Sequence, residues 1–146
     1  MINMPIEAVV RRRFSHPPER IFRAWVSPNE ICHWFRVDPK ATCECLELNS
    51  TPGGRYAFRM GGIMPARLVS GEYLEVQPTS RLSFTWLWEG HPAEKSTVVT
   101  VTLEPAPGNA TDLTIRHTRF PDQNMADEHG KGWTKTLDML EALLAS

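Results

Sequence analysis

The chain has 146 residues, enough for one ordinary domain that buries about two thirds of the surface of its unfolded chain. Hydrophobic residues make up 41% and charged residues 23%, and the net charge of −1 excludes a strongly basic nucleic-acid-binding domain and an acidic tail. No apolar run approaches the ~20 residues of a membrane span, and the first positive charges follow the N-terminal apolar run, unlike a secretory signal. We therefore expect one cytoplasmic domain over residues 1–146.

The first expected elements are a strand over residues 6–14 and a short helix over residues 19–26, in the segment ERIFRAWV. Helical spacing puts Ile21, Phe22 and Trp25 of this helix on one face, and the two prolines before Glu19 suit its first turn.

The four residues that follow this helix, SPNE, fit a capping box. In this motif Ser27 would cap a new helix and Glu30 would reach back to the backbone of Ser27. The motif predicts a second short helix that carries Ile31, Trp34 and Phe35.

Between residues 42 and 118 the hydrophobic period changes to two. Runs such as RLSFTWLWE and STVVTVTLE alternate apolar and polar residues, and groups of proline and glycine separate them at hairpin spacing. Six strands are expected here, which makes seven with the first and predicts an antiparallel sheet with one apolar face. The residues expected on that face are Tyr56, Phe58, Met60, Leu82, Phe84, Trp86, Trp88, Val99, Val101, Leu103, Leu113, Ile115 and His117.

A long C-terminal helix, over residues 122–145, is the expected cover for this face. It would be about 36 Å long, enough to cross a whole sheet. Helical spacing gives it one apolar stripe centred on Trp133. The other members of the stripe are Ala126, His129, Thr136, Leu137, Leu140, Leu143 and Leu144.

Two glycines, Gly130 and Gly132, precede Trp133, although glycine weakens a helix by about 1 kcal/mol relative to alanine. One interpretation is that the missing side chains let the helix approach the sheet or loops closely and let Trp133 turn inward. The alternative is that the helix breaks at His129 and restarts at Lys131.

This order of elements, β-α-α-β(6)-α, accompanies several familiar phrases. The segment FSHPPERIFRAWVSP resembles the opening of the helix-grip, START-like (SRPBCC) superfamily. Five further phrases match, in order, the branch similar to the C-terminal domain of the activator of the heat-shock protein 90 ATPase: TPGGRYAFRM, GEYLEVQPTSRLSFTWLW, TVVTVTLE, TDLTIRHTRF and HGKGWTKTLDMLEALL. The resemblance, from Glu7 to Leu144, implies an α+β fold: a curved seven-stranded antiparallel sheet packed on a long C-terminal helix, with a cavity between them. Relatives of this fold bind lipids, hormones, polyketides or antibiotics, and a few are enzymes, so the fold does not supply the function.

Our leading hypothesis is a non-enzymatic protein that binds a small apolar or aromatic molecule between the sheet and the C-terminal helix. His117 and His129 would supply polar contacts, because both are expected to face the same space. The full set of expected ligand-binding residues is Phe58, Met60, Trp86, Val101, His117, His129, Trp133 and Leu137.

Two other functions stay open at this stage. One is a chaperone-interacting role resembling the heat-shock protein 90 ATPase activators. The other is a cavity enzyme of the cyclase or hydrolase type that uses His117 and His129 as acid and base. The fold is also compatible with a homodimer. We expect no cofactor.

The three cysteines, Cys32, Cys43 and Cys45, cannot all pair, and a C-x-C spacing on a strand suits a local disulfide poorly. We therefore expect reduced thiols. With His33 they offer four soft donors, but zinc sites favour a C-x₂₋₄-C spacing, so no metal site is expected. The segment TPGGR, residues 51–55, precedes a strand rather than a helix and therefore predicts a hairpin turn, not a phosphate loop.

Overall fold

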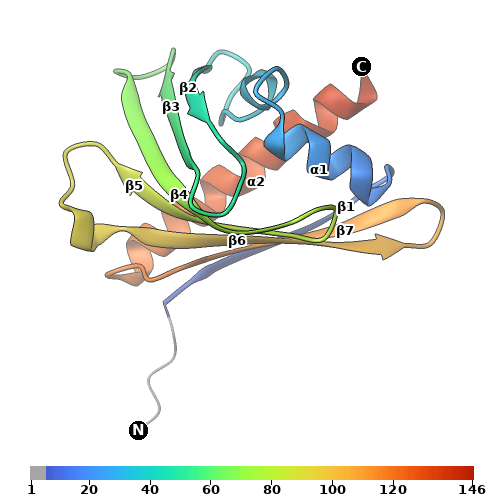
Figure 1. Ribbon diagram of the computed structural model, residues 1–146. Helices are drawn as coiled ribbons and strands as arrows, with labels where there is room; N and C mark the ends of the chain where they lie inside the picture. The colour runs from blue at the N-terminus through green and yellow to red at the C-terminus, as the bar shows by residue number, and fades with distance from the viewer. Residues whose placement is uncertain (1–5) are drawn as a thin grey trace, which may run out of the picture.

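The computed structural model describes residues 6–146, in which a seven-stranded antiparallel sheet curves around the helices (Figure 1). The first five residues, part of the stretch considered for a secretory signal, lie outside the described residues. The elements are, in chain order, β1 (Ala8–Phe14), α1 (Pro18–Val26), η1 (Ile31–His33), β2 (Thr42–Leu48), β3 (Arg55–Gly61), β4 (Arg67–Gln77), β5 (Arg81–Trp88), η2 (Ala93–Lys95), β6 (Thr97–Ala106), β7 (Ala110–Thr118) and α2 (Gln123–Ala145), where η1 and η2 are short 3₁₀ turns. The predicted α+β helix-grip fold is confirmed.

The strand order is β1-β7-β6-β5-β4-β3-β2, so every neighbour except β1 comes from a hairpin. Strand β1 reaches the far edge and pairs with β7, with Ala8 opposite His117. Register shifts interrupt the β2–β3 pairing near Cys45 and the β4–β5 pairing near Tyr73. Such bulges bend a sheet, and Figure 1 shows β2–β4 standing upright against the flat β6 and β7.

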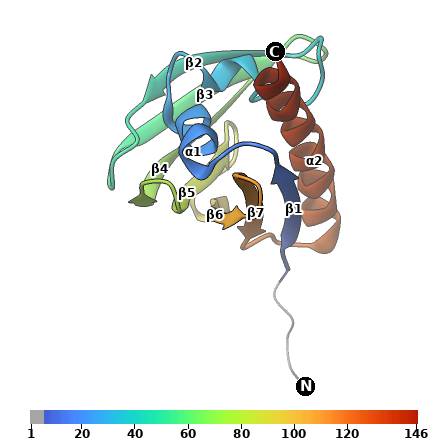
Figure 2. The same cartoon turned by 90° about the vertical axis from the view of Figure 1, so that its right-hand side faces the viewer.

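The two helices cover different parts of the concave face. Helix α2 packs along β1 and β7 at one edge, whereas α1 lies inside the curve of the sheet (Figure 2). Below α1, the space among Trp25, Phe35, Phe58 and Phe84 amounts to only about 10 Å³. A space of this size holds at most one water molecule, so this half of the interior is closely packed.

The predicted capping box at SPNE is wrong. The backbone N–H of Ser27 donates to Arg23 and ends α1, so it is not available to Glu30. The Glu30 carboxylate instead pairs with Arg20 at 2.8 Å and with Arg23 at 3.2 Å. In place of a second α-helix the chain makes only the 3₁₀ turn η1, although Ile31 and the two aromatic residues after it are buried as expected.

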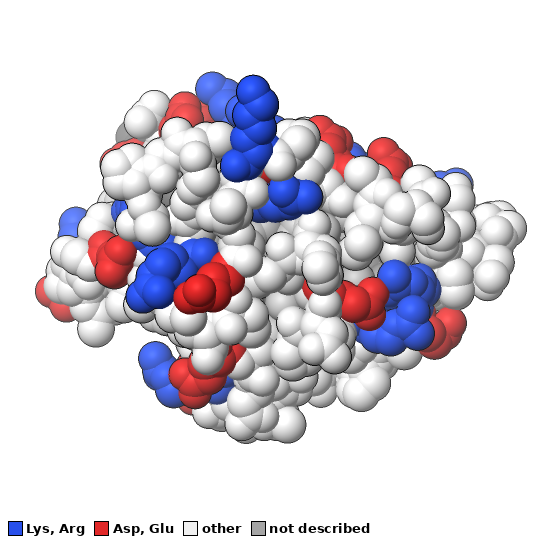
Figure 3. Space-filling model, turned by 90° about the horizontal axis from the view of Figure 1, so that it is seen from above, with Lys and Arg blue, Asp and Glu red and all other residues white. Residues whose placement is uncertain are grey.

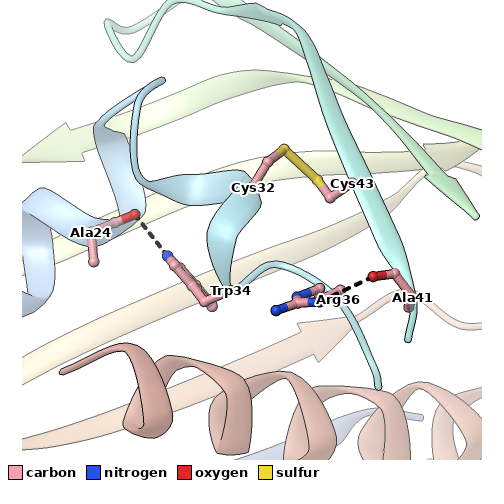
Figure 4. The surroundings of a disulfide bond; sticks show 6 residues. All are labelled: Ala24, Cys32, Trp34, Arg36, Ala41 and Cys43. Atoms are coloured by element: carbon pink, nitrogen blue, oxygen red, sulfur yellow. Dashed lines mark hydrogen bonds between the residues drawn. A yellow bond between two sulfur atoms is a disulfide. The ribbon is translucent and has the colours of Figure 1, made fainter. Parts of the chain in front are cut away.

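The expectation of reduced thiols is wrong for Cys32 and Cys43, which form a disulfide between η1 and β2 (Figure 4). Their Cα atoms lie 5.0 Å apart, within the usual range for such a bond. Spacing in the sequence did not indicate the pair, because the turn between the two residues brings them together. Cys45 is the free cysteine among the described residues.

Helix α2 runs without a break through both glycines, which excludes the alternative that the helix breaks at His129 and restarts at Lys131. The Asp122 side chain caps its start by accepting from the Met125 backbone N–H at 2.8 Å. A Cβ atom on Gly130 would meet Ala8 at 3.5 Å, and one on Gly132 would meet only Val37, at 3.9 Å. These are ordinary contact distances, so the suggested close approach does not require glycine at either position.

Charged side chains form separate groups on the face seen from above (Figure 3). On the face in Figure 3, basic and acidic side chains mostly lie beside one another, with wide uncharged areas between them. Within residues 6–146, no helix combines the length and the apolar composition that a membrane crossing requires.

Candidate functional site

A pocket of about 340 Å³ lies where α2 passes the ends of β3 and β5 and the start of β4. It lies beyond the part of the concave face that α1 fills. Four segments line it: α2, the inner face of β3–β5, the chain between η1 and β2, and the β3–β4 connection. The side chains that dominate its walls are Phe35, Arg36, Met60, Ile63, Met64, Arg67, Trp86, Trp88, His129 and Trp133.

The pocket stays open because α2 presents a residue without a side chain to it. Gly132 lies on the pocket wall, and only Val37 comes within 4 Å of the position that its Cβ would occupy. His129, about one turn before Gly132, and Trp133, the next residue after it, form the adjacent wall. Gly132 therefore contributes space to the pocket.

The wall between η1 and β2 is fixed from both ends. The Cys32–Cys43 disulfide closes this segment, which includes Phe35 and Arg36 (Figure 4). Within it, the Trp34 indole N–H donates to the Ala24 carbonyl at 3.0 Å and anchors the segment to α1. One side of the pocket is thus built from a short covalently closed loop.

His117 lies at the centre of a buried chain of hydrogen bonds. The Trp133 indole N–H donates to His117 Nδ1 at 3.0 Å. Because an indole nitrogen can only donate, Nδ1 carries no proton and Nε2 carries one. Nε2 therefore donates to the Thr97 hydroxyl at 2.7 Å, which in turn donates to the Trp86 carbonyl at 3.2 Å.

His129 takes the other neutral tautomer in a similar arrangement. Its Nδ1 lies 2.9 Å from the Met125 carbonyl and therefore carries the proton, because a carbonyl can only accept. Its Nε2 accepts the Trp88 indole N–H at 3.1 Å. Each histidine thus fixes one tryptophan of the pocket, and the two imidazole centres lie 5.1 Å apart.

Both histidines are held in the neutral form. Burial, and to a lesser extent the neighbouring His129, lowers the pKa of His117 from 6.5 to about 2. Burial also lowers the pKa of His129, with a smaller contribution from Arg67, against the opposing effects of the Met125 carbonyl and Glu128. Since every ring nitrogen already has a partner, the pair orients tryptophans rather than offering a free acid or base.

Four of the eight residues expected to bind a ligand line the pocket: Met60, Trp86, His129 and Trp133. The other four do not line it, and each is at most 2% exposed within the core: Phe58, Val101, His117 and Leu137. The structure thus brings half of the set together. Ligand binding by these residues stays a prediction.

Sequence reasoning missed several residues of the lining. Trp88 continues the alternation that points Trp86 inward. This alternation predicted that Trp88 lies on the apolar face of the sheet, but Trp88 was not among the expected ligand-binding residues. Arg36 follows the predicted second helix and Arg67 follows a group of glycine and proline, and no pattern indicated that either residue lines the pocket.

The candidate donors of a zinc site are not assembled. Cys32 and Cys43 are bonded to each other, and residues 6–146 hold no cluster of three or more histidine, cysteine or acidic side chains arranged to bind a metal ion.

A curved antiparallel sheet around a long C-terminal helix defines the helix-grip, or SRPBCC, class, whose members typically bind ligands. Residues 15–145 match the model of one family in that class, described as Activator of Hsp90 ATPase homolog 1-like protein. The chain therefore belongs to this family, and the resemblance seen in the sequence is confirmed.

Solved structures of similar proteins agree with this assignment. A protein from Chromobacterium violaceum is 29% identical, with a TM-score of 0.84 over 96% of this chain and 97% of that one. The AHSA1 protein from Silicibacter pomeroyi is 28% identical, with a TM-score of 0.80 over 95% and 97% of the two chains. A protein from Mesorhizobium loti is 31% identical, with a TM-score of 0.73 over 95% and 96%. The comparison with curated proteins gives no match.

Proposed function

We propose that this protein binds a small, largely apolar molecule in the pocket between the concave face of the sheet and α2. The observation that carries the proposal is the lining, in which Phe35, Met60 and three tryptophans surround about 340 Å³. This volume falls in the range of about 300–1,000 Å³ that is typical of small-molecule sites. Ile63 and Met64, both about half exposed at the β3–β4 connection, extend the apolar lining toward solvent.

The state of the histidines favours a binding protein over a cavity enzyme. Catalysis by the pair would need a free ring nitrogen within reach of the substrate. His117 is completely buried, and both nitrogens of His129 are engaged by Met125 and Trp88. A chaperone partner and a homodimer stay predictions.

The proposal predicts that Gly132→Leu weakens binding of a neutral aromatic probe, N-phenyl-1-naphthylamine, measured by fluorescence titration. The leucine side chain would fill space that the probe needs. A loss of about 1.4 kcal/mol in binding free energy raises the Kd tenfold. We expect the Kd to rise at least about tenfold.

Gly130→Ala is the matched control. Like Gly132→Leu it replaces a glycine of α2 with a better helix-forming residue, but Gly130 does not line the pocket. This variant should bind the probe as the wild type does. Circular dichroism should show that both variants are folded. Saturable binding that is equal in all three proteins, or no binding in any, would refute the proposed site.

A further inference from the structure

Two guanidinium groups line the pocket, and neither forms an ion pair within residues 6–146. They belong to Arg36, between η1 and β2, and to Arg67, at the start of β4. Glu128 is the one acidic residue of the described lining, and its carboxylate faces Lys131 at 3.4 Å. The lining of the pocket therefore carries two guanidinium groups against one carboxylate, and that carboxylate is paired with Lys131.

The strand register brings the two arginines to the same corner of the pocket. Arg36 Nη1 donates to the carbonyl of Ala41, at 3.2 Å, just before β2 begins (Figure 4). The next residue, Thr42, pairs with Gly61 at the end of β3, and the neighbouring Met60 pairs with Arg67. The backbones of Arg36 and Arg67 thus lie near the corner where β2 and β4 start and β3 ends, and both side chains line the pocket.

Arg67 is held in place in a way that leaves its donors free. Its guanidinium carbon lies 4.6 Å from the centre of the Trp88 ring, and Trp88 is itself fixed by its hydrogen bond to His129. Stacking uses the face of the guanidinium group, so the N–H donors around its edge still point outward. Such an edge matches the two oxygens of a carboxylate.

Arg36 is held by its backbone contacts and has an unsatisfied donor. Its Nη1 also donates to the Pro39 carbonyl at 2.7 Å, which fixes the side chain. Its Nε atom is buried and has no hydrogen-bond partner among the described residues. Nε is too deeply buried for a ligand to reach, so the group of Arg36 that can face a ligand is Nη2, which forms no hydrogen bond within residues 6–146.

We propose that the ligand of this pocket is an amphiphilic carboxylate, whose head group binds between Arg36 and Arg67 while its apolar body packs on Trp86, Trp88 and Trp133. The inference rests on the proposed function and specifies, in addition, that the ligand carries a negative charge. A neutral apolar ligand would contact the tryptophans but would form no charge-assisted hydrogen bond with either guanidinium group.

The test is calorimetric titration with octanoate, 1-octanol and octylammonium at pH 7.5, which share one alkyl chain. We expect octanoate to bind the wild-type protein at least about tenfold more tightly than octanol, because charge-assisted bonds to arginine are strong. Octylammonium should bind weakest. Arg67→Gln should remove most of the preference for octanoate over octanol.

Arg11→Gln is the matched control, since it removes the same charge from an exposed position on β1, at the opposite edge of the sheet from β2. It should leave the preference for octanoate intact. Arg36→Gln is a second test of the head-group site, and Arg67→Gln, at an exposed position, covers the case in which Arg36→Gln does not fold.

The outcomes separate the two proposals. If octanol binds as tightly as octanoate and Gly132→Leu blocks both, the inference about charge is wrong and the apolar site stands. The same conclusion follows if Arg67→Gln keeps the full preference. If none of the three compounds binds, both proposals are wrong.

Discussion

Replacing Trp133 with alanine is expected to lower the free energy of unfolding by about 3–5 kcal/mol, the range for large aromatic residues in a core. The ring of Trp133 contacts Trp25, Phe35 and Trp86 at centroid distances of 6.1, 5.7 and 5.3 Å. Its indole N–H also satisfies His117 Nδ1, which would otherwise be a buried acceptor without a partner. Trp133 therefore joins the filled half of the interior to the wall of the pocket.

Urea unfolding followed by circular dichroism measures this loss. Trp133→Phe is the companion variant, because it keeps one aromatic ring but removes the N–H donor and part of the buried side chain, so its loss should be smaller than that of Trp133→Ala. Trp88→Phe, at a half-buried position, should cost less than Trp133→Ala. A loss below about 1 kcal/mol for Trp133→Ala would contradict this account of the core.

Stability is expected to fall by about 2 kcal/mol between pH 7 and pH 5 through His117 alone. Burial lowers the pKa of His117 to about 2 in the folded protein, whereas an unfolded histidine titrates near 6.5. The unfolded chain therefore binds the proton more readily, so the contribution is complete above about pH 6.5 and is lost as the pH falls toward 2.

The measurement is the difference in unfolding free energy between pH 7 and pH 5, compared with the same difference in His117→Leu. The variant is less stable at both values because it leaves the Trp133 indole N–H unpaired, but its pH dependence should be smaller by about 2 kcal/mol. His91→Gln, at an exposed position, should keep the wild-type pH dependence. Equal pH dependence in His117→Leu and the wild type would show that His117 is not held neutral.

The sheet and α2 could be predicted from the sequence because each has one buried face, and burial on one face imposes a period. Alternation in RLSFTWLW put Leu82, Phe84 and Trp86 on the concave face, and all three are buried. The stripe of α2 was predicted in the same way. Propensity at Gly130 and Gly132 suggested a break, but packing of the rest of the helix outweighed their cost.

The site could be predicted only in part, because periodicity identifies a face but not which part of that face another element covers. Phe58 and Met60 share one side of β3, yet Phe58 lies in the filled core near α1, whereas Met60 lines the pocket. The disulfide depends on the approach of two segments, which no local pattern encodes. The capping box was wrong for a related reason, since Arg20 and Arg23 compete for Glu30.

The most direct test of the central claim is a titration of the ¹⁵N-labelled protein with N-phenyl-1-naphthylamine, observed at the indole N–H signals of the five tryptophans. Three of them, Trp86, Trp88 and Trp133, line the pocket, whereas Trp34 is fully buried and bonded to Ala24. We expect the signals of those three to move with one common Kd while the signal of Trp34 stays in place. Unchanged signals for the three pocket tryptophans, or a shift of Trp34 as large as theirs, would contradict a ligand site between the sheet and α2.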